Sequence, residues 1–301
     1  MINEPIEELT NCRICPCDCG VNRYTGRLGR CGAGSRIQVN LHQVHHGEEP
    51  VLSGCQGSGT IFFSHCNLLC HFCQNYSISH QGWGREASID ELIDMMIDLE
   101  RQGAHNINFV TPTHYTPLIR EAIIKAKDKG SKIPIVWNSN AYEKVETLQT
   151  LSGLVDIYLP DLKFMRENAA LLCTGRSDYP DIAGAAIKEM FRQAGYLHVD
   201  KDGIAEKGVL IRLLVLPHDL SGTGAALEWI ARELGSDTAI SLMAQYYPAG
   251  QAMQQHELNR GITPREYQDA IRCLEYWGFE NGFVQELSCS SQWTPDFQEN
   301  E

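Results

Sequence analysis

The sequence lacks several features that define broad classes of protein. No apolar run approaches the roughly 20 residues that a membrane-spanning helix needs, so we expect no membrane anchor. The first residues, MINEPIEELTNC, are acidic and contain no basic region followed by an apolar stretch, so we expect no secretory signal and a cytoplasmic protein. Positive charge is scarce: 25 Lys and Arg against 38 Asp and Glu give a net charge of −13, which disfavours a nucleic-acid partner.

Cysteine, in contrast, is abundant, with 12 residues in a chain of 301. Because thiols stay reduced in the cytosol, this number indicates metal or redox chemistry rather than a disulfide framework. Seven of the cysteines fall into two groups, a C-x2-C-x3-C-x11-C pattern near the N-terminus and a C-x3-C-x2-C pattern within SHCNLLCHFCQNY (64–76). The groups are Cys12, Cys15, Cys19 and Cys31, and Cys66, Cys70 and Cys73; Cys17 is left over, and the scattered Cys55, Cys173, Cys273 and Cys289 are expected to be small buried hydrophobic residues.

Hydrophobic residues make up 43% of the chain, and beyond residue 58 strand-like and helix-like segments alternate. This alternation predicts a parallel sheet with helical crossovers, either doubly wound or curled into a full or partial barrel. We divide the chain into a Cys-rich N-terminal metal-binding segment, 1–50, and a core domain, 51–301. The expected strands are 59–63, 107–110, 134–137, 155–159, 209–216, 239–243 and 283–287; the expected helices are 88–103, 117–130, 142–151, 185–195, 225–235 and 262–278.

The three-cysteine loop has one thiolate fewer than a closed metal site needs. Cysteine thiolates are the standard ligands of cubane iron–sulfur clusters, and three of them leave one of four irons open to a substrate or cofactor. The alternative is a zinc ion whose site is completed by His65 or His71. For the N-terminal cysteines, a closed zinc site, an auxiliary iron–sulfur cluster and no metal remain open.

The cysteine loop resembles the cluster motif of the radical S-adenosylmethionine (SAM) superfamily, with Phe72 before the last cysteine and a strand before the first. The run GEEPVLSGCQGSGTIFFSHCNLLCHFCQNYSIS (47–79) is similar to pyruvate formate-lyase activating enzyme-like members. The resemblance implies a partial (β/α)6-type TIM barrel of the radical SAM type behind a small Cys-rich segment. It also implies a [4Fe–4S] cluster on the loop cysteines, with SAM on the fourth iron, cleaved to methionine and a 5′-deoxyadenosyl radical. Other similar segments are 12–34, 107–115, 136–140, 158–164 and 242–249.

Cofactor contacts are expected at the ends of the second and third strands. Many superfamily members have a Gly-Gly-Glu-Pro turn that receives the SAM amino group, where this sequence has Thr-Pro-Thr-His (111–114). We therefore expect SAM contacts from Thr111, Thr113 and His114, the alternative being a turn without a ligand role. Asn138 and Asn140 are expected to meet ribose hydroxyls, although Asn is also a common turn residue.

Asp161 and Lys163 follow the fourth strand and resemble the Asp-Leu-Lys segment of glycyl radical enzyme activases, so they are the expected catalytic residues; an exposed salt bridge is the alternative. Arg212 lies within an apolar strand and should reach a carboxylate, such as that of SAM.

The expected function is radical SAM hydrogen abstraction from a partner, such as the glycine of a glycyl radical enzyme, with flavodoxin or ferredoxin as electron donor. The alternatives are modification of a small metabolite or another macromolecule, and a non-catalytic iron–sulfur or zinc-binding redox protein.

Overall fold

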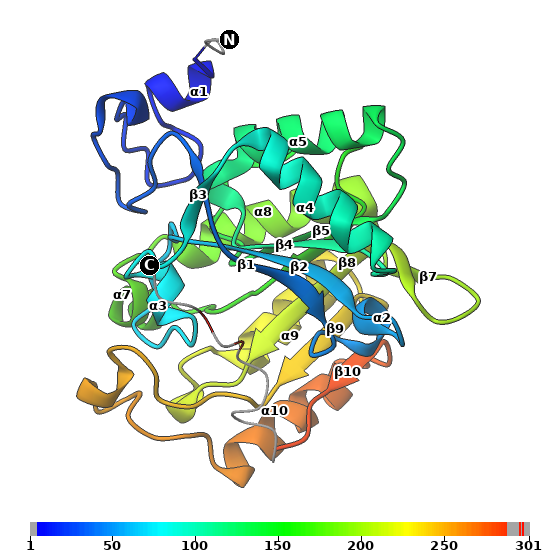
Figure 1. Cartoon of the computed structure of the whole chain (residues 1–301). Coiled ribbons are helices and arrows are strands. Elements are labelled where there is room, and N and C mark those ends of the chain that lie inside the picture. The colour runs from blue at the N-terminus through cyan, green and yellow to red at the C-terminus, as the bar shows by residue number, and fades with distance from the viewer. Residues whose placement is uncertain (1–4, 288–294, 296, 298–301) are drawn as a thin grey trace.

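Seven parallel strands form the centre of the fold, in a computed structural model whose described residues are 5–287, 295 and 297 (Figure 1). The sheet order is β10-β9-β8-β6-β5-β4-β2-β1-β3. The first seven strands in this order pair in parallel, and β1 is antiparallel to both β2 and β3. Its edge strands β3 and β10 do not pair with each other in the described part of the chain, so the barrel is partial, as the sequence predicts. The strands are β1 (Ile37–His45), β2 (Ser58–Phe63), β3 (Arg85–Ala87), β4 (Ile107–Val110), β5 (Ile135–Ser139), β6 (Ile157–Pro160), β7 (His198–Val199, antiparallel to β8), β8 (Ala205–Leu214), β9 (Ala239–Met243) and β10 (Gly282–Val284).

Helices connect the parallel strands and lie outside the curved sheet (Figure 1). Two of them begin at a capping box, in which Ser88 pairs with Glu91 and Thr263 pairs with Glu266. The helices are α1 (Glu7–Thr10), α2 (Pro50–Ser53), α3 (Tyr76–Ser79), α4 (Ile89–Arg101), α5 (Thr116–Asp128), α6 (Val145–Gln149), α7 (Glu167–Thr174), α8 (Tyr179–Ala194), α9 (Thr223–Glu233) and α10 (Pro264–Tyr276).

The structure differs from the sequence prediction at several elements. Besides those described next, β3, β7, α1, α2 and α3 were not predicted, and α8 begins at Tyr179, before the expected start at 185. Strand β1 lies within the predicted N-terminal segment 1–50 but pairs with β2 of the core sheet. Its residues IQVNLHQVH include five polar side chains, because only one face of this strand is covered, and the sequence pattern is correspondingly weak. Helix α6 is shorter than predicted, and α7 was not predicted.

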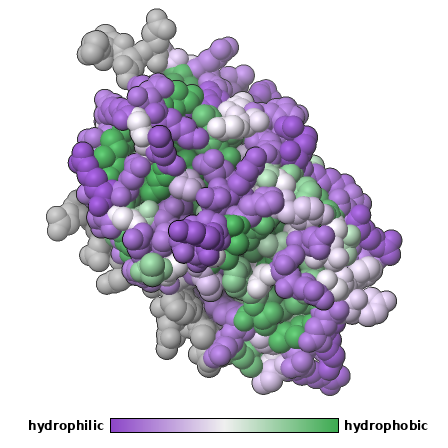
Figure 2. Space-filling view, turned by 90° about the vertical axis from the view of Figure 1, so that its right-hand side faces the viewer, coloured by the Kyte–Doolittle hydropathy of each residue, from purple (hydrophilic) through white to green (hydrophobic). Residues whose placement is uncertain are grey.

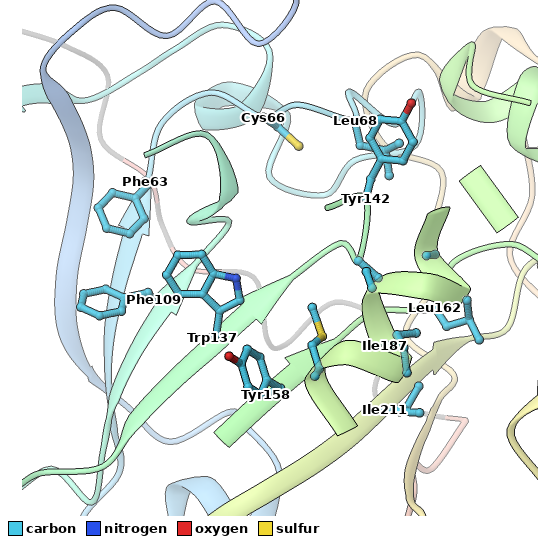
Figure 3. Packing of buried hydrophobic residues seen from close by; sticks show 14 of the residues in the cluster. Phe63, Cys66, Leu68, Phe109, Trp137, Tyr142, Tyr158, Leu162, Ile187 and Ile211 are labelled. Atoms are coloured by element: carbon cyan, nitrogen blue, oxygen red, sulfur yellow. The ribbon is translucent and has the colours of Figure 1, made fainter. Parts of the chain in front are cut away.

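Strand residues alternate between the helices and the interior of the barrel. Figure 3 shows Phe63, Phe109, Trp137 and Tyr158 side by side on the helix-facing side of β2, β4, β5 and β6. Their neighbours in sequence point into the barrel, where Leu52 of α2 packs against buried residues such as Val136, Ile157 and Leu159. Apolar packing around Leu52 thus fills the interior of the barrel near α2, which leaves the carboxyl ends of the strands as the place for a site.

The molecular surface is mostly hydrophilic on the face shown in Figure 2, with hydrophobic patches at the upper left, in the middle and in the lower part of the view. Among the described residues, no helix is long and apolar enough to cross a membrane. Cys55 is exposed, which contradicts its predicted burial, whereas Cys173 is buried and Cys273 is half-buried; Cys289 lies outside the described residues.

Candidate metal and cofactor site

The three-cysteine loop runs from β2 to α3, at the carboxyl end of the first parallel strand. His65 and Leu69 adopt left-handed backbone conformations (φ 72° and 58°), which fold the loop tightly. A backbone hydrogen bond from His65 N to Ile78 O, 2.8 Å long, ties the start of the loop to α3. The loop therefore returns on itself, and Cys66 and Cys70 are buried while Cys73 is half-buried.

The cysteine side chains converge on one cavity. Burial raises the pKa of Cys70, and the neighbouring Cys73 and Cys66 raise it further, although Lys163 opposes them. Burial likewise raises the pKa of Cys73. These shifts favour neutral thiols at Cys70 and Cys73, so a metal centre that binds there must displace their protons.

A cavity of about 830 Å³ opens in front of the three cysteines, at the carboxyl ends of the parallel strands. Its size is within the range of small-molecule sites. Polar side chains from β5, β6, β8 and β9 or the turns that follow them face the cysteine loop across it. The lining includes Cys66, Cys70, Cys73, Glu48, Glu49, Thr111, Asn138, Asn140, Asp161, Lys163, Arg212 and Ser241.

The cysteine loop fits a multi-iron cluster better than a zinc ion. No three His, Cys, Asp or Glu side chains of the described residues lie close enough to hold one metal ion. The two histidines proposed to complete a zinc site have other partners: His65 Nε2 is 2.8 Å from Gln38 Oε1, and His71 Nδ1 is 2.6 Å from Gln255 Nε2. A cubane spreads its ligands over several irons, so its sulfurs need not approach one point.

Asn140 joins the cysteine loop to the end of β5. Its Nδ2 donates to Asn67 Oδ1 at 2.9 Å and lies 3.5 Å from Cys66 Sγ, while its Oδ1 accepts from Tyr142 N at 2.9 Å. Asn67 in turn donates to Tyr142 O at 2.7 Å. Asn140 lines the cavity, as predicted, but its amide is already used to hold the loop.

The predicted catalytic pair lies in the cavity wall. Lys163 Nζ donates to Asp161 Oδ2 at 2.8 Å, and their side chains are only 18% and 22% exposed. Burial alone would lower the pKa of Lys163, but Asp161 and Cys70 outweigh it and the pKa is raised, so the ammonium is charged. Asp161 Oδ1 is buried without a hydrogen-bond partner among the described residues. The side chain of Asp161 lines the cavity, and an unsatisfied acceptor of this kind suits the ammonium or a hydroxyl of a bound ligand.

The turn after β4 needs a correction. Thr111, at φ 59°, lines the cavity, but Thr113 and His114 are fully buried and do not line it. The 3-10 turn Thr113–Tyr115 directs both side chains into the core, where His114 Nε2 is 2.9 Å from Ser64 O. Burial lowers the pKa of His114 to about 3, so its ring is neutral and part of the support of the cysteine loop.

Arg212 reaches a carboxylate, as predicted, and the partners belong to this chain. Its Nε and Nη2 both donate to Glu49 at 2.8 Å, its Nη2 also contacts Glu48, and its Nη1 is 3.4 Å from Asn138 Oδ1. Asn108 Nδ2 donates to Glu48 at 3.1 Å, which links the network to β4. Glu48 and Glu49 were not predicted as site residues, because a salt bridge across 163 positions has no local sequence signal. A contact between Arg212 and SAM stays a prediction.

The N-terminal cysteines surround a buried arginine. Arg23, 3% exposed, donates to Cys12 Sγ at 3.0 Å and lies 4.0 Å from Cys31 Sγ. Cys19 instead accepts a hydrogen bond from Arg30 N at 3.3 Å. The described residues contain no group arranged for a single metal ion, so the geometry does not support a tetrahedral zinc site here. An auxiliary cluster stays a prediction for the set Cys12, Cys15, Cys19 and Cys31.

Replacing Asn140 by Ala should weaken iron binding by about tenfold, because groups that orient metal ligands typically contribute 10- to 100-fold to metal affinity. The measurement is iron retained per chain against increasing chelator, after anaerobic reconstitution. Asn168→Ala, at an exposed position of α7, is the matched control. If the two variants retain iron equally, Asn140 does not support the loop.

Comparisons with known proteins identify the family of this chain. Residues 60–195 match the model of the family described as Radical SAM superfamily. Uncharacterized protein MJ0674 of Methanocaldococcus jannaschii is 31% identical over 280 residues, which cover 90% of this chain and 76% of that relative.

Two solved structures are similar in fold. The crystal structure of HydG, a maturase of the [FeFe]-hydrogenase, has a TM-score of 0.52 at 13% identity, over 74% of this chain and 50% of HydG. Methylornithine synthase (PylB) has a TM-score of 0.51 at 12% identity, over 80% of this chain and 77% of PylB. This chain therefore spans half the length of HydG, and at these identities both likenesses bear on the fold alone.

Proposed function

Because the chain belongs to the radical SAM superfamily, whose members use a [4Fe–4S] cluster and SAM, we propose that it is a cytoplasmic enzyme that abstracts hydrogen from a partner molecule. The observation that supports this proposal most is the convergence of the three loop cysteines on one cavity. When bound, the cluster and SAM supply one electron to break the S–C5′ bond and a 5′-deoxyadenosyl radical to take the hydrogen atom.

In this proposal the residues of the chain bind the cluster and SAM and orient them for the reaction. Cys66, Cys70 and Cys73 hold the cluster. The free acceptor of Asp161 and the carbonyl groups of the turn at Thr111 receive polar hydrogens of SAM, and Asn138 meets its ribose. Lys163, charged and next to Asp161, orients that carboxylate and offers its remaining hydrogens to the cavity.

The partner that we propose is the glycine of a glycyl radical enzyme, with a flavodoxin or ferredoxin as electron donor. The support is the similarity of the Asp-Leu-Lys segment, 161–163, to that of the activases. The cavity volume of about 830 Å³ favours a second candidate, a small metabolite that enters the barrel beside SAM.

An isotope experiment separates these candidates. The reduced enzyme is incubated with SAM and a candidate glycyl radical enzyme whose glycine carries deuterium at Cα. The proposal expects deuterium in 5′-deoxyadenosine and a glycyl radical signal by electron paramagnetic resonance (EPR). Deuterium transfer from labelled small molecules alone would contradict the activase function and support the second candidate. Intact SAM under all conditions would contradict both.

A further inference from the structure

Two of the three loop sulfurs accept hydrogen bonds from nearby side chains. Ser79 Oγ lies 3.2 Å from Cys73 Sγ, and Asn140 Nδ2 lies 3.5 Å from Cys66 Sγ. The serine contact is the shorter one, and its hydroxyl has no part in joining the loop to β5. The contact between Ser79 and the three-cysteine loop is therefore not explained by the network that joins this loop to β5.

The fold brings Ser79 back to Cys73, although the two residues are six positions apart in the sequence. Ser79 is the last residue of α3, and its backbone N donates to Asn75 O at 2.9 Å. The bond between His65 N and Ile78 O fixes the same turn against the end of β2. Ser79 is only 6% exposed, so its hydroxyl does not exchange this contact freely for water.

His80 holds the hydroxyl from the other side. Its Nδ1 is 2.8 Å from Ser79 Oγ, and its ring stacks on Tyr76 with 4.2 Å between centroids and 15° between planes. A hydroxyl has one hydrogen to donate. A metal-bound thiolate can only accept, and a hydrogen bond from Ser79 to Cys73 requires the His80 tautomer whose Nδ1 carries the hydrogen and donates to the hydroxyl oxygen.

We propose that Ser79, oriented by His80, is a positioning residue that hydrogen-bonds the Cys73 ligand and raises the reduction potential of the bound cluster. The inference rests on the proposed function only in its assumption that the loop holds an iron–sulfur cluster. A hydrogen bond to a cluster sulfur withdraws electron density and stabilises the reduced state, and such bonds are among the protein's means of setting cluster potential. A higher potential makes reduction of the cluster by a biological electron donor more favourable.

The test is a redox titration of the reconstituted cluster, followed by EPR, without SAM or partner. Ser79→Ala should shift the midpoint potential to a more negative value while iron per chain stays at the wild-type level. Ser79→Thr, which keeps the hydroxyl, should restore the wild-type potential. His80→Phe keeps a ring to stack on Tyr76 but removes the nitrogen, so a smaller shift in the same direction is expected.

Ser77→Ala is the control, since Ser77 lies on the same helix, is half-buried, and has no side-chain hydrogen bond to a cysteine among the described residues. An unchanged potential in a fully loaded Ser79→Ala variant would overturn the inference and leave the proposed function intact. If Ser79→Ala does not take up iron, the inference is tested on Ser79→Thr and His80→Phe instead. Equal midpoint potentials in His80→Phe and the wild-type chain would overturn the inference. A wild-type chain that never binds a cluster would instead contradict the proposed function.

Discussion

Replacing Cys70 by Ala should abolish iron uptake and reduce SAM cleavage by more than about 100-fold, beyond the range that changes outside the metal ligands produce. Cys70 is buried between the other two loop cysteines, and a cubane that keeps only two thiolates has two irons without protein ligands. The expected iron content falls from about four per chain to background after anaerobic reconstitution. Iron analysis and chromatography of 5′-deoxyadenosine measure both quantities on the same sample.

Cys55→Ala is the control for this substitution, because Cys55 is exposed and is not part of either cysteine group. It should bind iron and cleave SAM like the wild-type chain. If the Cys70 variant keeps its iron, or if Cys55→Ala loses as much, the three-cysteine loop is not the cluster site.

The second large effect is a loss of folding stability when Arg212, which lies in a buried network of ion pairs, is replaced. Glu48, Glu49 and Arg212 expose only 8%, 7% and 13% of their side chains. Arg212→Met removes the only cation that contacts the two carboxylates among the described residues. Leaving buried charge without a partner typically costs about 3–5 kcal/mol. Denaturant unfolding of the metal-free chain should show a loss of this size.

A compensated variant distinguishes charge from packing. When Glu48→Gln and Glu49→Gln are added to Arg212→Met, no uncompensated carboxylate remains and most of the lost stability should return. If the triple variant is as unstable as Arg212→Met, the loss of stability comes from lost packing of the arginine side chain and not from uncompensated charge.

The pH dependence of these variants has a definite sign. Burial alone raises the pKa of Glu49, but Arg212 outweighs it, so the folded pKa lies below the ordinary value of 4.5. In the wild-type chain this stabilisation is therefore present above about pH 4.5 and is lost as the pH falls through the folded pKa. In Arg212→Met the lowering effect of Arg212 is lost, and burial, the largest cause, is opposed only by hydrogen bonds from Ser241 and the backbone. The pKa of Glu49 should therefore rise, and this variant should recover stability as the pH falls towards 5. Unfolding curves measured between pH 5 and 8 check this; a variant least stable at the acidic end would contradict it.

The sequence predicted the parallel strands well, because each is a short apolar run between Gly, Pro or polar turn residues, as in β4 and β9. It also predicted the position of the cysteine loop, since the residues that follow a parallel strand must lie at its carboxyl end. Strand β1 was missed because half of its side chains are polar and its pairing with β2 is not a local property.

The prediction of the site was limited in the same way, because contacts between residues far apart in the sequence have no local signal. An arginine in an apolar strand requires a carboxylate, but nothing in the sequence identified Glu48 and Glu49 as its partners. The turn at 111–114 was assigned to the cofactor as a whole, although its 3-10 geometry buries Thr113 and His114. Ser79 had no signal, since its contact with Cys73 depends on how α3 closes the loop.

The most direct test of the account is the EPR spectrum of the anaerobically reconstituted and reduced chain, recorded without and with SAM. If SAM occupies an iron that the protein leaves open, the spectrum of a reduced [4Fe–4S] cluster should change when SAM is added, and 5′-deoxyadenosine and methionine should form in equal amounts. A cluster spectrum that SAM leaves unchanged, or a loop that contains zinc after preparation without oxygen, would contradict the account.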